Sequence, residues 1–171
     1  MKKLVTLLLE LICIFYIVNV FNNFTTSLPV PIQPISENLI LKEIKEDLVT
    51  LKAPIAKIPK LAQSVYTSHQ ATGINPKLVL ALMKTESNFN ESAIGPKNRT
   101  AIRYKGILQT PTASWFTDVD ILHGVRIFEE KLKITKNDIP KALALYKGGN
   151  NQVARKQANE VLTVYKSLQK K

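Results

Sequence analysis

The sequence predicts an all-α domain with at most a small β-ribbon, preceded by an N-terminal transmembrane or signal segment. Three observations support this fold class. Apolar residues recur at helical spacing from Ile58 onwards, no convincing run of residues alternates as strands would, and an apolar stretch opens the chain. Hydrophobic residues make up 45% of the 171 residues, which is enough for one packed domain with extensions.

The opening stretch, residues 4–21, follows Lys2 and Lys3. It is close to the roughly 20 residues that a membrane-spanning helix needs. It is longer than the core of a signal peptide and lacks an Ala-x-Ala cleavage site, so an uncleaved anchor is favoured over a cleaved signal. The lysine pair predicts a cytoplasmic N-terminus. We therefore expect the folded domain on the periplasmic or extracytoplasmic side of a bacterial membrane, or on a virion membrane.

A linker separates this segment from the domain. Pro29, Pro31 and Pro34 indicate extended chain, and Ser36 is a candidate N-cap for a helix that ends near Lys52. This helix could pack on the domain or act as a spacer, and the sequence leaves both open. The expected regions are 1–24 (anchor or signal), 25–56 (linker and spacer helix) and 57–171 (catalytic domain).

Capping signals place the later helices. Gly73 is a plausible helix stop, and Asn75 followed by Pro76 is a strong helix start. A loop around residues 94–105 is the one place where a small ribbon is expected. The other helices are expected at about 59–70, 118–133, 139–146 and 151–168.

The charge balance points to an anionic partner. The formal net charge is +11, which suits nucleic acid, lipid headgroups or an acidic wall polymer. Nucleic acid is disfavoured because the domain is expected to be exported and has no zinc-ligand pattern. His69 and His123 lack partners at metal-ligand spacing, so we predict neither a metal nor another cofactor. Cys13 is the single cysteine, which excludes an intrachain disulfide.

Glu86 is the most unusual carboxylate in the sequence. It follows Val79, Leu82 and Met83 by seven, four and three residues, so it shares their apolar helix face. Burial and the nearby helix C-terminus both disfavour its charged form, which raises its pKa. A raised pKa suits a group that donates a proton at neutral pH. The alternative is that Glu86 merely reaches past the last turn into water.

Four motifs in order resemble the lytic transglycosylases related to goose-type lysozyme, over about residues 60–168. The family has a helix that ends in Glu-Ser, a Gly-Leu-Met-Gln segment, a helix with Ala-Gly-x-x-Tyr-Leu and an Ala-Leu-Ala-x-Tyr-Asn-x-Gly signature. The corresponding stretches here are GINPKLVLALMKTESNFN (73–90), GILQ (106–109), DILHGVRIFEEKL (120–132) and ALALYKGG (142–149). The resemblance implies a lysozyme-like helical fold and activity on peptidoglycan glycan strands.

The resemblance also implies roles for single residues. Glu86 would protonate the oxygen between N-acetylmuramic acid and N-acetylglucosamine, and would then take the proton of the muramic acid 6-hydroxyl as a 1,6-anhydro ring closes. Gln109 would orient a sugar or the acid, and the Tyr146 hydroxyl would hold the Glu86 carboxyl. Three further residues would line the substrate groove: Ser87, Gly106 and Leu108.

The chain departs from the family in three ways that bear on the groove. One is that Thr110 and Pro111 follow Gln109 at a spacing one residue shorter than usual. Lys147 stands where the family has asparagine, and its cation could change substrate contacts or lower the pKa of the acid. Gln109 lies 23 positions after Glu86, more than is usual, so the intervening loop is expected to be enlarged. Lys147 is therefore included among the expected substrate-binding residues.

A hydrolase is the main alternative, since glycosidases that use water generally need two carboxylates. The candidates for a second are Glu91, Asp118 and Asp120, and the two aspartates are more typical of a helix cap. A single acid with an intramolecular nucleophile fits the sequence better. A peptidoglycan-binding module without activity is the other alternative. A small membrane-linked enzyme of this type is typical of local wall opening by phages or by envelope-spanning machines.

Overall fold

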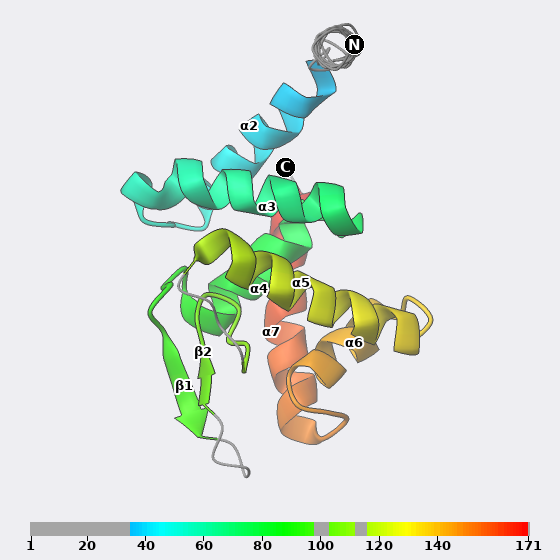
Figure 1. The fold of residues 1–171 in the computed structure, drawn as a ribbon. Coiled ribbons are helices and arrows are strands. Elements are labelled where there is room, and N and C mark those ends of the chain that lie inside the picture. Colours follow the sequence, from blue (N-terminus) through cyan, green and yellow to red (C-terminus); the bar gives the residue numbers. More distant parts are fainter. Residues whose placement is uncertain (1–34, 98–102, 112–115, 171) are drawn as a thin grey trace, which may run out of the picture. The chain divides into compact units, whose positions relative to one another are not determined.

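The computed structural model describes residues 35–97, 103–111 and 116–170. Residues 36–171 form one compact unit. The described residues are mostly helical, with a single small ribbon, so the predicted all-α class is confirmed (Figure 1). The elements are α2 (Ile35–Thr50), η1 (Ile55–Lys57), α3 (Ile58–Thr72), α4 (Pro76–Ser87), β1 (Ile94–Lys97), β2 (Arg103–Lys105), α5 (Thr117–Ile134), α6 (Ile139–Tyr146) and α7 (Gln152–Gln169).

Two helix ends follow the predicted capping signals, whereas α2 begins at Ile35 and therefore contains Ser36, the predicted N-cap. The Asn75 side chain accepts a hydrogen bond from the Lys77 amide at 2.9 Å, and α3 ends at Gly73 with a left-handed φ of 71°. Such a φ favours glycine because glycine has no Cβ. The start of α5 differs, since its N-cap is Phe116 and no side chain caps it. The expected capping role of Asp118 or Asp120 is therefore wrong.

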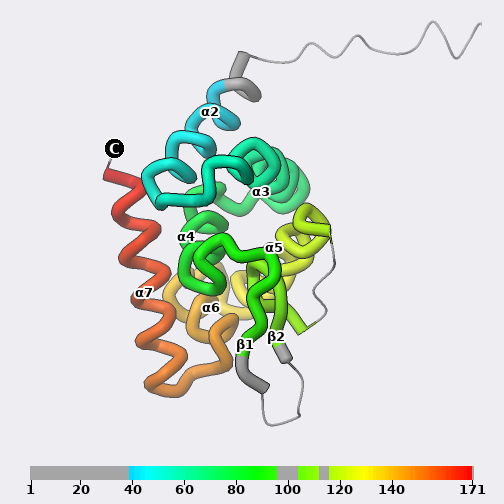
Figure 2. The backbone as a smooth tube through the Cα atoms, turned by 90° about the vertical axis from the view of Figure 1, so that its left-hand side faces the viewer, coloured from blue at the N-terminus to red at the C-terminus, as the bar shows by residue number. Residues whose placement is uncertain are grey.

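Helix α4 lies between α3 and α7 (Figure 2). Its residues from Leu78 to Met83 are all at most 2% exposed, so it is buried on every side. A helix enclosed in this way gives a rigid base for the side chains of its last turn. Glu86 is one of those side chains.

Helix α2 packs on this core, which settles the question that the sequence left open. Ile44 and Leu48 are 2% and 0% exposed, and Leu51 is also buried. Glu43 forms an ion pair with Lys77 of α4 at 2.8 Å, and the Lys84 ammonium donates to the Leu51 carbonyl at 3.0 Å. The helix is thus part of the compact unit and does not act as a separate spacer.

The expected anchor, residues 4–21, lies outside the described residues. Among the helices that the structure does describe, none is long and apolar enough to cross a bilayer.

The loop after Glu86 forms the predicted ribbon. Strands β1 and β2 are antiparallel, with Ile94 opposite Lys105 and an irregular register between Ile94 and Lys97. Lys105 also pairs with Thr110, which carries the ribbon into the following turn. The ribbon therefore borders the segment that carries Gln109.

Candidate active site

Glu86 lies in the last turn of α4 with its side chain only 13% exposed. The apolar residues that share its face, Val79, Leu82 and Met83, are all fully buried. Burial raises the pKa of Glu86, whereas the charge and hydrogen bond of Lys147 act in the opposite direction. Burial is the stronger effect, so the pKa stays above its ordinary value. The expectation of a buried carboxyl with a raised pKa is met.

Lys147 is the direct partner of this acid. Its ammonium lies 2.9 Å from Glu86 Oε1, and its side chain is 7% exposed. Lys147 follows the last residue of α6 and closes that helix by donating its backbone amide to the Leu143 carbonyl at 2.9 Å. Because both side chains are shielded from water, either charge would be poorly solvated without its partner. Separating the two side chains is therefore costly.

Glu86 and Lys147 face a cleft of about 490 Å³. Four of the seven predicted site residues line it: Glu86, Gln109, Tyr146 and Lys147. The other three, Ser87, Gly106 and Leu108, are absent from the lining. The remaining lining residues are Thr85, Ala93, Ile94, Gly95, Tyr104, Thr110, Pro111, Ile127, Gly148, Gln157 and Glu160.

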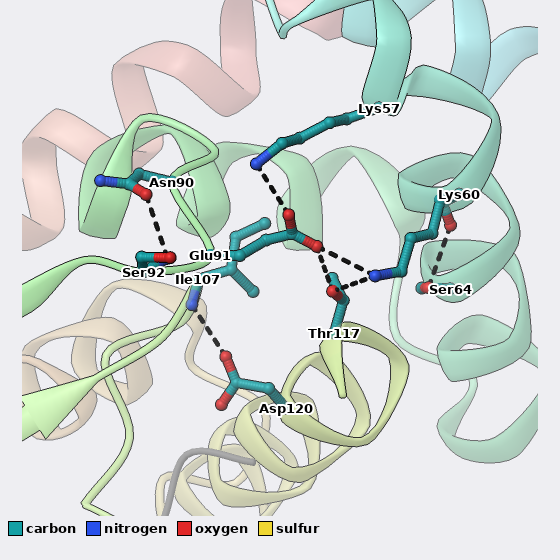
Figure 3. A network of polar contacts seen from close by, with 9 residues as sticks. All are labelled: Lys57, Lys60, Ser64, Asn90, Glu91, Ser92, Ile107, Thr117 and Asp120. Atoms are coloured by element: carbon teal, nitrogen blue, oxygen red, sulfur yellow. Dashed lines mark hydrogen bonds and ion pairs between the residues drawn. The ribbon is translucent and has the colours of Figure 1, made fainter. Parts of the chain in front are cut away.

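The turn at residues 106–110 is anchored by Asp120, which is 3% exposed. Its Oδ2 accepts the Ile107 amide at 2.8 Å (Figure 3). Its Oδ1 accepts the Thr110 hydroxyl at 3.1 Å. Ser87 adds a bond from the other side, because its hydroxyl donates to the Ile107 carbonyl at 2.8 Å. Burial raises the pKa of Asp120 although these donors oppose the shift. This carboxylate fixes the turn and does not line the cleft.

The Leu108 side chain packs closely against α5 at Gly124. A Cβ on Gly124 would lie 2.7 Å from the Leu108 Cβ and Cδ1, so only glycine fits there. The Tyr146 hydroxyl donates to the Leu108 carbonyl at 2.8 Å, and its ring meets Phe128 edge-to-face with centroids 6.0 Å apart. Tyr146 therefore holds the turn, whereas the Glu86 carboxyl is held by Lys147.

Gln109 has a left-handed backbone, with φ of 50°, and its side chain bends back on the ribbon. The amide nitrogen donates to the carbonyls of Gly106 at 2.8 Å and Ala93 at 3.2 Å. A Cβ on Gly95 would lie only 2.5 Å from the amide oxygen, so Gly95 allows this close approach. Gln109 thus borders the cleft and also joins the turn to the start of β1.

Glu91, one candidate for a second catalytic carboxylate, lies in a separate polar network (Figure 3). It forms ion pairs with Lys57 at 2.7 Å and Lys60 at 3.2 Å and accepts the Thr117 hydroxyl. Partial burial alone would raise the pKa of Glu91, but the bonds from Lys57, Thr117 and Lys60 outweigh it and lower the pKa to about 2. Glu91 does not line the cleft, and it ties the segment after α4 to α3 and α5.

A second carboxylate does line the cleft, and it is Glu160 of α7, which the sequence did not lead us to expect. It is an exposed residue, and Gln157, one turn earlier, lines the cleft with it. A polar pair on the exposed face of a helix is common, so nothing in the local sequence distinguishes this one. Asp118, the last candidate considered, is exposed and outside the lining.

Replacing Glu91 with glutamine should lower stability at pH 7 by about 1–2 kcal/mol, a discounted value because the lysines are partly exposed. The pKa of Glu91 is depressed in the folded state, so its contribution is present above the ordinary value of 4.5 and lost as the pH falls towards 2. Urea unfolding from pH 7 to pH 2 should show the two proteins converging in this window. Glu46→Gln, in an exposed pair, is the control. A constant difference down to pH 2 would contradict the assignment.

Comparison with known families gives one match, over part of the chain. Residues 64–119 match the family model described as Transglycosylase SLT domain, which confirms the resemblance to SLT-type lytic transglycosylases. The match covers about a third of the chain and includes Glu86 and Gln109 but not Tyr146 or Lys147. No curated protein and no solved structure matches the chain. A domain of this family implies peptidoglycan lytic transglycosylase activity in general terms.

Proposed function

We propose that the protein cleaves the bond between N-acetylmuramic acid and N-acetylglucosamine in peptidoglycan and leaves a 1,6-anhydro end. The observation that carries this proposal is the Glu86 carboxyl, which is nearly buried, borders the cleft and has a raised pKa. A carboxyl in this state can donate a proton at neutral pH. The family match over residues 64–119 supplies the substrate class.

The reaction needs one carboxyl in two roles. Glu86, protonated, gives its proton to the glycosidic oxygen as the bond to the muramyl C1 breaks. The 6-hydroxyl of the same sugar then attacks C1, and its proton returns to the Glu86 carboxylate. The nucleophile belongs to the substrate, so the intramolecular step needs no bound water.

A lysozyme-type hydrolase is the second candidate, and Glu160 is the observation that favours it. A hydrolase needs a second carboxylate to activate water or to form a covalent intermediate. Glu160 is the other carboxylate that lines the cleft in the described part of the chain. It comes from the exposed face of α7, whereas Glu86 lies on the buried helix α4.

The products of digestion separate the two reactions. We expect mass spectrometry of digested sacculi to show anhydro-muramic ends, about 18 Da lighter than hydrolysed ends because no water is added. Glu160→Gln should still form anhydro ends, with kcat lowered by less than about tenfold, since loss of a general base usually costs 10²–10⁴. Reducing muramic ends from the unaltered protein, and their loss in Glu160→Gln, would identify a hydrolase.

We further propose that residues 4–21 hold the enzyme to a membrane, with the cleft on the periplasmic or extracytoplasmic side. The support is the length and apolar character of the segment and the preceding Lys2 and Lys3. A tethered enzyme of this size suits local opening of the wall for phage entry or for an envelope-spanning machine. Fractionation with an alkaline carbonate wash tests the anchor, since an integral protein stays in the pellet.

A further inference from the structure

The acid of this cleft is bound to a cation of its own chain. Lys147 lies 2.9 Å from the Glu86 carboxylate, and both side chains are largely shielded from water. A cation at this distance favours the ionised carboxylate. The proposed reaction begins with the protonated form, which burial of Glu86 favours and the Lys147 charge opposes, so the ion pair holds back the protonation that the reaction needs.

The cleft provides few other ionisable groups that face this pair. Among the described lining residues they are Glu160 of α7, Tyr104 of β2 and Tyr146 of α6. Tyr146 is buried and its hydroxyl is already bonded to the Leu108 carbonyl. Glu160 is exposed and solvated, so it competes weakly for a cation that is held in a shielded pair.

An anionic substrate can compete more strongly. Each muramic acid carries a lactyl group, whose carboxylate is free in denuded glycan and otherwise bears a peptide with carboxylates of its own. A glycan strand that fills the cleft displaces water, which strengthens attraction between an ammonium and a carboxylate. Lys147 lies in the cleft lining, within reach of such a group.

Resting on the proposed function, we propose that Lys147 recognises a carboxylate of the muramyl unit, and that this contact releases Glu86 to become the protonated acid. The cleft thus selects glycan that carries a carboxylate, and the selecting charge is the Lys147 ammonium beside the catalytic Glu86. In the exchange, the Lys147 ammonium keeps its three protons and moves from Glu86 to the substrate carboxylate. The Glu86 carboxylate takes one proton from solvent, and this proton is the one transferred to the glycosidic oxygen.

The test compares matched substrates. Glycan oligomers of one length are prepared with free lactyl carboxylates and with the same groups converted to neutral methylamides. A second pair carries stem peptides whose carboxylates are either free or amidated. The unaltered protein should cleave the anionic member of at least one pair with kcat/KM about tenfold higher or more, the change expected for one unit in the pKa of the acid. The pair that shows the preference identifies the carboxylate.

Lys147→Asn, which restores the residue of the family, should reduce this preference to about twofold or less. The loss should come from faster cleavage of the neutral substrate, because Glu86 without its cation is more easily protonated. For the same reason the alkaline limb of the pH profile on neutral glycan should move to higher pH. Lys147→Met, also neutral, should behave in the same way, and Lys147→Arg should keep the preference. A general loss of packing would lower both rates and leave their ratio unchanged.

The outcomes separate this inference from the proposed function. If anhydro ends form but Lys147→Asn keeps the full preference, Lys147 is not the recognition residue and the inference is overturned. Equal rates on both members of each pair would overturn it as well. If Glu160→Gln alone removes the preference, the preference depends on the charge of Glu160, and the assignment to Lys147 and the substrate carboxylate is overturned. If no substrate yields anhydro ends, the proposed function itself fails.

Discussion

Replacing Glu86 with glutamine should lower the rate of glycan cleavage by about 10³-fold, within the 10²–10⁴ range of general acid–base catalysis. The substitution keeps the size of the side chain and removes the proton that the glycosidic oxygen requires. Release of soluble fragments from purified sacculi measures the effect. Lysis at the unaltered rate would refute the assignment of the acid. A parent protein that binds sacculi without cleaving them would indicate a binding module.

The experiment needs two controls because Lys147 loses its counter-charge in this variant. A buried cation left without its partner can destabilise the fold by a few kcal/mol. Glu86→Gln combined with Lys147→Met removes both charges and should be equally inactive while melting closer to the parent. Glu130→Gln, an exposed glutamate on α5, makes the same chemical change away from the cleft and should leave cleavage unchanged.

Local patterns were sufficient to predict most of the helices. The side chains of Asn75 and Asn151 cap α4 and α7, so the chain carries these boundaries in neighbouring residues. The burial of Glu86 also follows from local spacing, since its face continues Val79 and Met83. In these cases the residues that decide the structure lie within two turns of one another.

Contacts between distant segments were not predictable in the same way. Asp120 occupies the first turn of α5, where an aspartate usually interacts with the helix, yet it binds Ile107 and Thr110 of the preceding turn. The direction of the Asp120 side chain depends on how that turn packs against α5. The sequence of α5 alone does not carry this information. Glu160 lines the cleft because α7 lies beside α4. Nothing in the sequence of α7 distinguishes Glu160 from any other exposed glutamate.

The family resemblance identified the residues around the acid but not the way they are connected. It led us to expect the Tyr146 hydroxyl at the Glu86 carboxyl. In the structure Lys147, the residue that departs from the family, occupies that place, and Tyr146 binds the Leu108 carbonyl. The substitution of one residue after the signature tyrosine thus coincides with a different set of bonds in the site.

The contact between Gly124 and Leu108 leads to the second large prediction. Gly124→Val should destabilise the protein by about 3 kcal/mol, at the upper end for overpacking, because even a Cβ would lie 2.7 Å from Leu108. The new side chain would push Leu108 and its carbonyl away from Tyr146 and shift Gln109 at the edge of the cleft. Urea unfolding measures the stability, and cleavage of sacculi should fall with it.

A double-mutant cycle tests whether the contact between Gly124 and Leu108 causes the loss of stability in Gly124→Val. Leu108→Ala alone should cost about 2–5 kcal/mol because Leu108 is fully buried. In the double variant the contact with Leu108 Cδ1 is gone and only the Cβ–Cβ approach remains, so the combined cost should fall below the sum by about 1 kcal/mol. Arg126→Val, an exposed position on the same helix, controls for valine in α5 and should cost little. Strictly additive costs would show that Gly124 is required for a reason other than the approach of Leu108.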